Sequence, residues 1–365
     1  MTPTRKIKPT RVREIEVRGG PRAMGLQLGE AARDEVRAYA ALVVERFNIG
    51  RKSRLTSEVA LAVAAAAIPY AECYLPEAME ELRGIAEGAG VTVEQAMLIN
   101  VRNQLGAIAP PEGCTSVLVE PRASASGVGI VAQNWDNDPA TDGFSVVLTR
   151  RPAGKPAFMT FTRPGEVAYL GLSASGIGIA LNAMPGAQRR AGVPWYFLLR
   201  AMFEAPGLDA AVKEIERAER AIPANALLTT PEGGADLEIT LDAVRALQPG
   251  TQGTLVHTNH CVHPDLVSIN DRYSGEIYGQ SFPRKVRAEQ ILGGESRPVE
   301  LERIQRLLSD HEGYPTSICR HPNDDPATGW QRSVVSVILE PAVGRMHLSR
   351  GNPCENPYEI YELRS

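Results

Sequence analysis

A glycine and a cysteine stand together where a loop meets an apolar run in "PPEGCTSVLVE", residues 110–120. The apolar run after Cys114 is short and β-branched, which is typical of a strand. A thiol at such a junction is a candidate nucleophile, because cysteine is strongly nucleophilic once it loses its proton. The alternative is a small residue followed by a buried, inert thiol.

Cleavage of the Gly113–Cys114 peptide bond would make Cys114 a chain terminus and supply its own base. A free α-amino group has a pKa of about 7.7–8.0, which suits proton transfer near neutral pH. The same thiol can perform the cut by attacking the Gly113 carbonyl, and water then hydrolyses the thioester. Gly113 suits this step because a residue without a Cβ tolerates strained backbone. The pair therefore predicts a self-cleaving N-terminal nucleophile.

Histidine is the alternative base, and three of the six histidines lie in "LVHTNHCVHPD". Continued as a strand, this segment would place His257, Cys261 and His263 on one face. His260 would then point to the other face. A structural zinc site is a further alternative, but the spacing is poor and we find no second Cys-x-x-Cys or His pair to complete four ligands. We expect no metal and no bound cofactor.

Five motifs follow one another in a fixed order, namely "EGCTS", "AQNWDN", "LVHTNHC", "YPTSICRH" and "GNPCENPYEIYEL". This ordered set resembles the acyl-coenzyme A:6-aminopenicillanic acid acyltransferase family, also called isopenicillin N acyltransferase-like proteins. The resemblance extends from "GLQLGE" near residue 25 to "NPCENPY" near residue 358. It implies an autoproteolytic cysteine N-terminal-nucleophile hydrolase with a four-layer αββα sandwich of antiparallel sheets.

The resemblance also implies roles for individual residues. Cys114 matches the nucleophile, so cleavage would release an α chain, residues 1–113, and a β chain, residues 114–365. Asp136 matches the aspartate that holds the freed α-amino group, since a carboxylate stabilises an ammonium. Asn259 matches the asparagine whose side-chain N–H faces the oxyanion, a donor that contributes on the order of 3 kcal/mol. The alternatives are that Asp136 opens the turn "DNDPATDG" and that Asn259 caps a loop.

Further residues are expected to support these. Arg320 in "SICR" matches a site arginine that favours the thiolate or pairs with a substrate carboxylate, the alternative being a surface arginine. Thr240 in "LEITL" stands where the penicillin enzyme has a serine, and Asn182 in "GIALNAM" is a candidate second oxyanion donor. Ser317, in the same motif as Arg320, and Thr115, next to the nucleophile, complete the predicted site. Cys261, Cys319 and Cys354 are expected to be buried small apolar residues.

The elements that must position these residues come in blocks. Residues 21–105 predict helices, including one that begins at Pro76 and one with a capping box at Thr92 and Gln95. From Thr115 onward, short β-branched segments predict strands, interrupted by helices near residues 195–219 and 283–309. A closing hairpin is predicted at residues 333–350. Because strands and helices do not alternate strictly, we expect antiparallel sheets covered by helices.

Composition limits the class of protein. The chain has 365 residues, 43% of them hydrophobic, and a net charge of −4, so it should fold as an ordinary globular protein that does not bind nucleic acid. The basic opening segment "TPTRKIKPTRVREIEVRGG" is interpreted as a solvated arm. No apolar run is long enough to span a membrane, and no signal-peptide core is visible. Five scattered cysteines suit a reducing compartment, so we expect a cytoplasmic protein.

These observations predict an amidohydrolase or acyltransferase that acts on a small-molecule amide or thioester through an S-acyl intermediate on Cys114. Acyl-coenzyme A is considered as a donor, although no phosphate-binding Gly-rich loop is visible. The protein would be an α/β heterodimer made from one chain. The remaining alternatives are an uncleaved thiol hydrolase that pairs Cys114 with a histidine, and a non-catalytic binding protein on the same scaffold.

Overall fold

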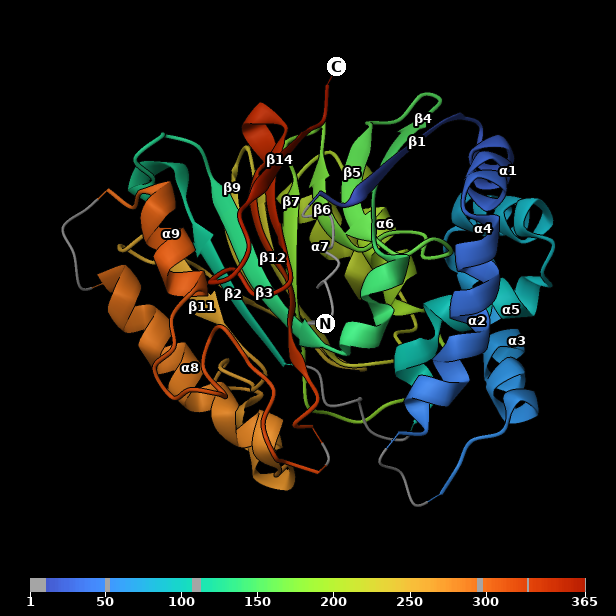
Figure 1. The fold of residues 1–365 in the computed structure, drawn as a ribbon. Coiled ribbons are helices and arrows are strands. Elements are labelled where there is room, and N and C mark those ends of the chain that lie inside the picture. The colour runs from blue at the N-terminus through green and yellow to red at the C-terminus, as the bar shows by residue number, and fades with distance from the viewer. Residues whose placement is uncertain (1–10, 50–52, 107–112, 294–297, 327, 365) are drawn as a thin grey trace, which may run out of the picture.

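The strand-rich part of the chain forms two β-sheets that stack face to face. The computed structural model describes residues 11–49, 53–106, 113–293, 298–326 and 328–364. Figure 1 shows the two sheets in the middle of the molecule, with helices on the outer face of each. The Pro and Glu residues at 110–112, predicted to form a loop before Gly113, lie outside the described residues.

The larger sheet has eight strands in the order β1-β4-β5-β6-β7-β8-β9-β10. All neighbours in it are antiparallel except β1 and β4, which pair in parallel. The strands are β1 Arg13–Gly19, β4 Val146–Pro152, β5 Phe158–Thr162, β6 Leu170–Ser173, β7 Gly178–Ala183, β8 Ala224–Thr230, β9 Gly233–Ile239 and β10 Val244–Leu247.

The smaller sheet has six strands in the order β11-β2-β3-β12-β13-β14, all antiparallel. Its strands are β2 Gly113–Val119, β3 Ile130–Asn137, β11 Thr254–His257, β12 Arg332–Glu340, β13 Arg345–Arg350 and β14 Glu359–Glu362. Strand β2 begins at Gly113, lies between β11 and β3, and is buried along its whole length. The sheet therefore carries Cys114 in its interior.

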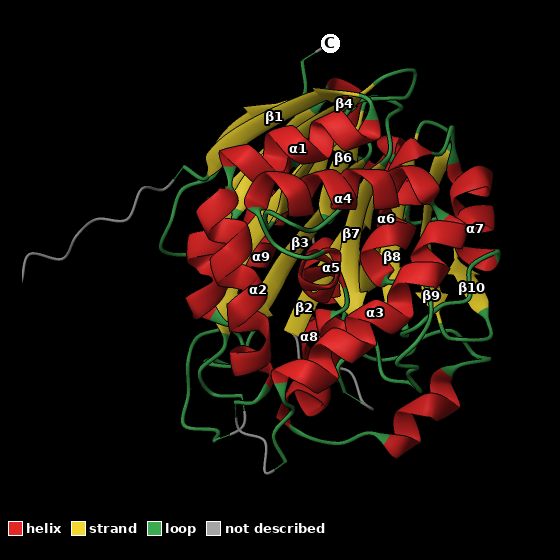
Figure 2. Cartoon of the chain, turned by 90° about the vertical axis from the view of Figure 1, so that its right-hand side faces the viewer, coloured by secondary structure: helices red, strands yellow, loops and turns green. Residues whose placement is uncertain are grey.

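Helices cover both outer faces and give four layers. Figure 2 shows α1–α5 in front of the larger sheet, with α6 and α7 beside them, and Figure 1 shows α8 and α9 against the smaller one. The helices are α1 Pro21–Ala31, α2 Arg33–Phe47, α3 Ser57–Tyr74, α4 Pro76–Ala89, α5 Val93–Asn100, α6 Trp195–Glu204, α7 Leu208–Glu216, α8 Glu276–Gly293 and α9 Leu301–Leu308. The predicted αββα sandwich is confirmed.

Glycines allow α1 and α4 to cross with their backbones in contact. Gly25 and Gly29 of α1 face Gly84 and Gly88 of α4, and a Cβ added at any of the four would overlap the backbone of the other helix. Both helices are buried on this side; α4 begins at Pro76, as predicted, and ends at Ala89, followed by a left-handed Gly90. The predicted capping box of α5 is also present. The helical segment before Cys114 is thus closely packed.

The opening segment differs from its prediction as a solvated arm. Residues 1–10 lie outside the described residues, but Arg13–Gly19 form the edge strand β1, which pairs in parallel with β4. Alternating residues explain this, because Ile15 and Val17 are buried while Glu14, Glu16 and the basic residues face outward. The short strands β10 and β14 were also not predicted.

Two apolar clusters fill the layers. The larger lies between the two sheets and under α1–α7, and the smaller, which includes Val117, Ala132 and Leu307, lies between the smaller sheet and α8 and α9. Leu181 N of β7 donates to Gln133 Oε1 of β3 at 2.7 Å and joins the two sheets. Among the helices that the structure describes, none is both long and apolar enough to cross a membrane.

Candidate active site

The register of β2 and β3 brings Cys114 and Asp136 to the same end of the smaller sheet. Gly113 lies opposite Asp136, and Cys114 lies opposite Trp135. A Cβ at Gly113 would come 2.9 Å from Asp136 Oδ2 and 3.1 Å from its Cβ, so the carboxyl group occupies the space that a side chain would need. Gly113 has no positive φ. The glycine is thus explained by close approach rather than by strained backbone.

Asn259 contacts Cys114, the predicted nucleophile, directly. The backbone N–H of Cys114 donates to Asn259 Oδ1 at 2.9 Å, and Asn259 Nδ2 donates to the Ala183 carbonyl at 3.1 Å. Its backbone N–H donates to Ser281 Oγ at 2.7 Å. The side-chain N–H predicted to face an oxyanion is therefore bonded to Ala183, and it is the amide oxygen that faces Cys114.

Arg284 of α8 is a central residue that the sequence did not reveal. Its Nη1 donates to the Cys114 carbonyl at 2.5 Å and to Thr115 Oγ1 at 2.8 Å, while Nη2 donates to Asn259 Oδ1 at 2.8 Å. Burial lowers the pKa of Arg284, and the nearby Asp136 opposes this shift. In "FPRKVR" it looks like any arginine on a helix, and only the packing of α8 against β2 and β11 identifies it.

Asp136 is buried within β3 rather than placed in a turn. Ser333 Oγ donates to Asp136 Oδ1 at 2.6 Å. Burial raises the pKa of Asp136, and the charges of Arg284 and Arg320 and the Ser333 hydrogen bond only partly offset this. The site therefore holds one buried carboxyl group between two buried guanidinium groups, next to Gly113.

Arg320 is 1% exposed, so it is not a surface arginine. Its guanidinium donates to Gln280, and its backbone N–H donates to Ser333 Oγ at 3.0 Å. Ser317 Oγ donates to the Cys319 carbonyl at 2.7 Å, within the same loop. Ser333 thus bonds both Asp136 and the backbone of Arg320, which joins these two predicted residues.

A small cavity of about 30 Å³, partly open to solvent, borders Cys114. Asn182 lies in it, and its Oδ1 is buried without a hydrogen-bond partner among the described residues, while its Nδ2 reaches the His257 carbonyl at 3.4 Å. Asn103, which was not predicted, also lines the pocket with a buried, unpartnered Oδ1. The other lining residues are mainly apolar, namely Tyr169, Leu181, Ala183, Gln188, Trp195, Ile222, Pro223 and Ala224.

The Thr240 hydroxyl is bonded within a turn and not to Cys114 in the described contacts. It follows β9, and its hydroxyl accepts from the Ala243 N–H at 3.0 Å in the turn before β10. No hydrogen bond that the structure describes joins Thr240 to Cys114. The strand residue near the histidine segment is instead Glu238, whose carboxylate contacts both His257 and the backbone N–H of His263.

The histidines of residues 257–263 are engaged away from the thiol. Strand β11 ends at His257, so the predicted alternation of faces does not continue to Cys261 and His263. His257 Nδ1 contacts the Thr258 carbonyl at 2.8 Å, and Nε2 contacts Glu238 at 2.9 Å. Burial lowers the pKa of His257, but the neighbouring carboxylates outweigh burial and raise it overall. His260 bonds Ser281 Oγ and stacks on Phe282.

The exposed position of Cys354 differs from the prediction. Cys261 and Cys319 are buried, as predicted, but Cys354 is exposed. It lies in the loop that follows β13, where the chain leaves the sheet before β14.

Comparison with known proteins gives a relative and matches among solved structures. The chain is 27% identical over 296 residues, 79% of its length, to the 40 kDa form of acyl-coenzyme A:6-aminopenicillanic-acid-acyltransferase from Emericella nidulans, and covers 78% of that protein. Among solved structures, a mutant of conjugated bile acid hydrolase from Clostridium perfringens has a TM-score of 0.44 at 11% identity, covering 69% of this chain and 97% of that one. Penicillin V acylase from Agrobacterium tumefaciens has a TM-score of 0.45 at 11% identity, covering 68% and 86%.

A family model supplies the assignment. The model described as acyl-coenzyme A:6-aminopenicillanic acid acyl-transferase matches residues 123–355, more than half of the chain. The matched range begins after Cys114 and includes Asp136, Asn259 and Arg320. The chain therefore belongs to the acyl-coenzyme A:6-aminopenicillanic acid acyl-transferase family.

Proposed function

We propose that the protein is a self-cleaving cysteine amidohydrolase or acyltransferase in which Cys114 becomes the N-terminal nucleophile. Family membership supports acyl transfer. The observation that carries the proposal for this chain is the arrangement around the Gly113–Cys114 bond, where Asp136 lies against Gly113 and Asn259 Oδ1 accepts from the Cys114 N–H. These are the groups that a newly formed α-amine would meet.

In the proposed cleavage, Cys114 Sγ attacks the Gly113 carbonyl carbon and the C–N bond breaks. The thiol proton passes to the Cys114 nitrogen, which becomes an amine, and Gly113 is held as a thioester. Water then hydrolyses the thioester, which leaves a Gly113 carboxylate and a free Cys114 thiol. Arg284, bonded to the Cys114 carbonyl, fixes the position of the residue while this happens.

Turnover repeats the same chemistry on a substrate. The α-amine of Cys114 takes the thiol proton, and the sulfur attacks the carbonyl carbon of an amide or thioester and forms an S-acyl intermediate. The leaving amine or thiol takes a proton from the ammonium. Water or an amine then accepts the acyl group, so the proposal covers both hydrolysis and transfer. Asp136, between Arg284 and Arg320, would stabilise the ammonium.

The pocket beside Cys114 supports a substrate whose acyl part is mostly apolar. Its lining is mainly aliphatic and aromatic, which favours contact with a hydrocarbon group. Asn103 and Asn182 each place there a buried Oδ1 with no partner among the described residues, and because an amide oxygen accepts, we assign these two atoms to an N–H or O–H donor of the substrate. An acyl-coenzyme A with an apolar acyl group is a substrate of this kind.

We propose that the two products of cleavage stay together as an α/β heterodimer. Residues before Gly113 supply β1, which pairs along its whole length with β4 of the later segment. They also supply Glu81, which forms buried ion pairs with Arg150 and Arg200. Both contacts join the segments without using the Gly113–Cys114 bond.

The uncleaved thiol–histidine alternative has less support. His257, the predicted base that lies in β11, has both ring nitrogens engaged by Thr258 and Glu238. It pairs in register with Ser116 rather than with Cys114. A base would have to leave these buried contacts to reach the thiol.

Intact mass of freshly purified protein under denaturing conditions tests the proposal. We expect two fragments that meet between Gly113 and Cys114 in the wild type, and one intact chain in Cys114→Ala. Cys261→Ala, which removes another buried thiol, is the matched control and should be cut like the wild type. A wild-type chain that remains whole near 39.4 kDa after long incubation would overturn the N-terminal-amine mechanism.

A further inference from the structure

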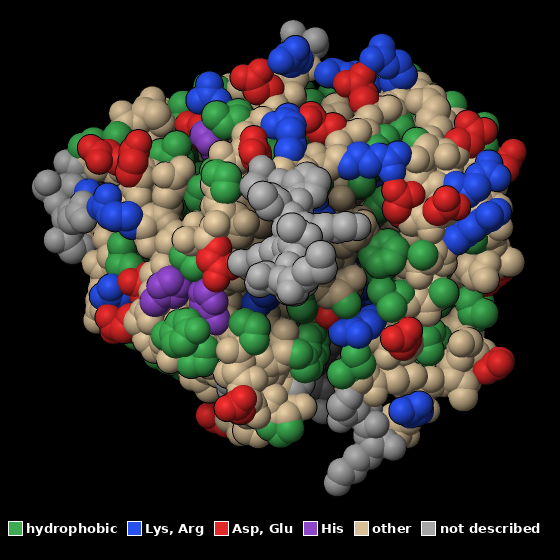
Figure 3. Space-filling view, in the orientation of Figure 1, with side chains coloured by type: hydrophobic (Ala, Val, Ile, Leu, Met, Phe, Trp, Pro, Cys, Tyr) green, Lys and Arg blue, Asp and Glu red, His purple; other side chains and the backbone are tan. Residues whose placement is uncertain are grey.

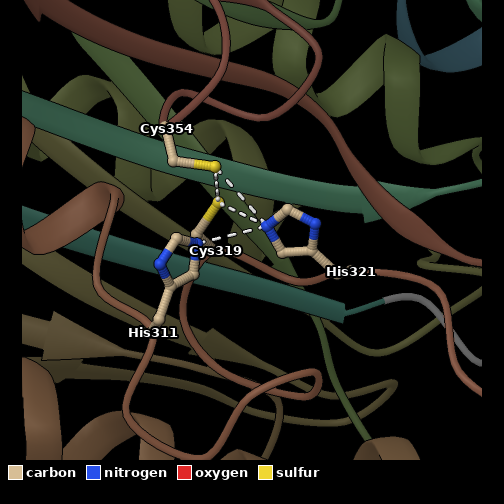
Figure 4. A group of neighbouring side chains, drawn as sticks. All are labelled: His311, Cys319, His321 and Cys354. Carbon is tan, nitrogen blue, oxygen red and sulfur yellow. Dashed lines mark hydrogen bonds between the residues drawn. The ribbon is translucent and has the colours of Figure 1, made fainter.

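Two cysteines and two histidines converge at a place remote in sequence from Cys114. His311, Cys319 and His321 lie in the loop that follows α9, and Cys354 lies in the loop that follows β13. We call these four residues the Cys–His cluster. Figure 4 shows their side chains pointing toward a common centre, and the four ligand atoms all lie within 4.8 Å of one another.

Four of the six distances between the ligand atoms are close to the edges of a small tetrahedron, and the other two are within 4.8 Å. The two sulfur atoms are 3.5 Å apart, and the two histidine Nε2 atoms are 3.2 Å apart. His321 Nε2 lies 3.7 Å from Cys319 Sγ and 3.5 Å from Cys354 Sγ. A tetrahedral zinc ion has Zn–S bonds of about 2.3 Å and Zn–N bonds of about 2.0–2.1 Å. Those bonds give edges of about 3.8 Å for S–S, about 3.3 Å for N–N and about 3.5 Å for S–N.

The surroundings of the cluster suit metal-bound thiolate and imidazole. Asn352 Nδ2 donates to Cys319 Sγ at 3.4 Å and also to the Arg320 carbonyl at 2.7 Å. His321 Nδ1, on the far side of the ring from the cluster, lies 3.9 Å from a Glu355 carboxylate oxygen. Partners of this kind orient ligating side chains in known metal sites.

An ion can reach the cluster from solvent. His311 and Cys354 are exposed, His321 is half-buried and Cys319 is buried. Figure 3 shows histidine side chains gathered at one place on this face of the molecule. The spacing of the ligands explains why the sequence pointed to no metal, because His311, Cys319 and His321 form no familiar pair and Cys354 comes from another loop.

We propose that the Cys–His cluster binds one Zn²⁺ ion as a structural site that fixes the loop carrying Arg320. Two neutral imidazoles and two thiolates are a donor set that favours tetrahedral zinc. Binding releases the two thiol protons to solvent. Four protein ligands leave no open position, so the ion takes no part in the reaction at Cys114. Arg320 stands between the ligands Cys319 and His321, so the ion would act on it as a positioning element.

A disulfide between Cys319 and Cys354 is the competing use of the same atoms. It would need the sulfur atoms to close from 3.5 Å to about 2.05 Å, and an oxidant to remove two electrons and two protons. It would also leave both histidines without a role. The two possibilities differ in metal content and in the number of free thiols.

The first experiment measures metal per chain by inductively coupled plasma mass spectrometry, on protein purified without chelators. We expect about one zinc per chain in the wild type and in Cys114→Ala, so the result is independent of any chain cleavage. Cys354→Ser should lose at least about nine-tenths of the zinc. Cys73→Ser, which changes an exposed cysteine of α3 outside the cluster, should keep it.

A second measurement does not depend on whether a variant folds. Reduced, metal-free wild-type protein is titrated with Co²⁺, and we expect saturation at one ion per chain with the visible absorption of tetrahedral cobalt bound to thiolate. Zn²⁺ added afterwards should remove that absorption, and hydrogen exchange of residues 317–321 should slow when the ion is bound. Absence of metal as purified together with no uptake of Co²⁺ would overturn the proposal. A disulfide would also overturn it. In that case the denatured wild type, which has five cysteines, would show three free thiols, whereas Cys354→Ser would show four.

Discussion

Glu81 gives the sharpest test of how the segment before Cys114 is held. It lies in α4, is fully buried, and its carboxylate contacts Arg150 Nε of β4 at 2.6 Å and Arg200 Nη1 of α6 at 2.8 Å. In Glu81→Ala, Arg150 would lose the only carboxylate to which the described contacts pair it, while Arg200 would keep Glu204 at 2.5 Å. Removal of one partner from a buried pair costs about 3–5 kcal/mol of stability, so we expect about 4 kcal/mol here.

Glu80→Ala is the matched control for Glu81→Ala. The two glutamates are neighbours on the same helix, so the substitution changes helix propensity equally. Glu80 is 46% exposed on its side chain and pairs with Arg83 at 2.6 Å and Arg22 at 3.5 Å. Exposed pairs of this kind contribute about 0–1 kcal/mol. The difference between the two variants therefore isolates the buried contacts.

Guanidinium chloride unfolding, followed by circular dichroism, measures the difference. If the free energy of unfolding falls by about 4 kcal/mol per M of denaturant, a loss of about 4 kcal/mol in Glu81→Ala lowers the unfolding midpoint by about 1 M. Glu80→Ala should lower it by less than about 0.25 M. If the midpoints of Glu81→Ala and Glu80→Ala agree within that smaller shift, the buried ion pairs do not hold the segment and the reasoning is refuted.

Three further predictions follow from the same contacts. Burial alone would raise the pKa of Glu81, but its two arginine partners outweigh burial and lower it. The contribution of Glu81 to folding stability is therefore present above about pH 4.3 and is lost as the pH falls through the folded pKa. The wild type should thus lose more stability in acid than Glu81→Gln in the same titration. Gly113→Ala places a Cβ 2.9 Å from the Asp136 carboxylate, so it should lower the stability by about 1–3 kcal/mol and slow chain cleavage. Gly143→Ala, where a Cβ meets nothing within 4 Å, should do neither. Equal unfolding midpoints of the two variants would contradict this. Arg284→Met should lower kcat/KM for thiol release from an acyl-coenzyme A by about 100-fold, with Lys285→Met near wild type, and equal rates in the two variants would remove Arg284 from the site.

Local patterns predicted most of the fold. Short β-branched segments and helical spacing identified most strands and helices, because burial of one face is imposed on each element by itself. Strand β1 was missed because Arg and Glu residues surround Ile15 and Val17, and its partner β4 lies far along the chain. Charge alone suggested an arm, whereas pairing at a sheet edge determines the structure.

The motifs located several residues that the fold brings near Cys114, and their roles stay predictions. Asp136 lies on β3 opposite Gly113, and Arg320, which lies in a loop, is buried. Arg284 and Asn103 were not predictable, because nothing in a helical "PRKVR" or in the segment after α5 distinguishes a residue that contacts Cys114 or its pocket. Those positions depend on packing between elements that are distant in sequence.

The contact of α1 and α4 through glycine has a consequence for how the N-terminal segment unfolds. Helices whose backbones touch cannot slide or separate by small side-chain adjustments, so the two should open together as one cooperative unit. Glu81 lies on α4 at this crossing, and its carbonyl faces Gly25. Local opening of α1 would therefore disturb the buried ion pairs at the same time. The free energy of opening that protects the amides of α1 from hydrogen exchange should then be close to that of the sheet, although α1 itself lies in the outer layer.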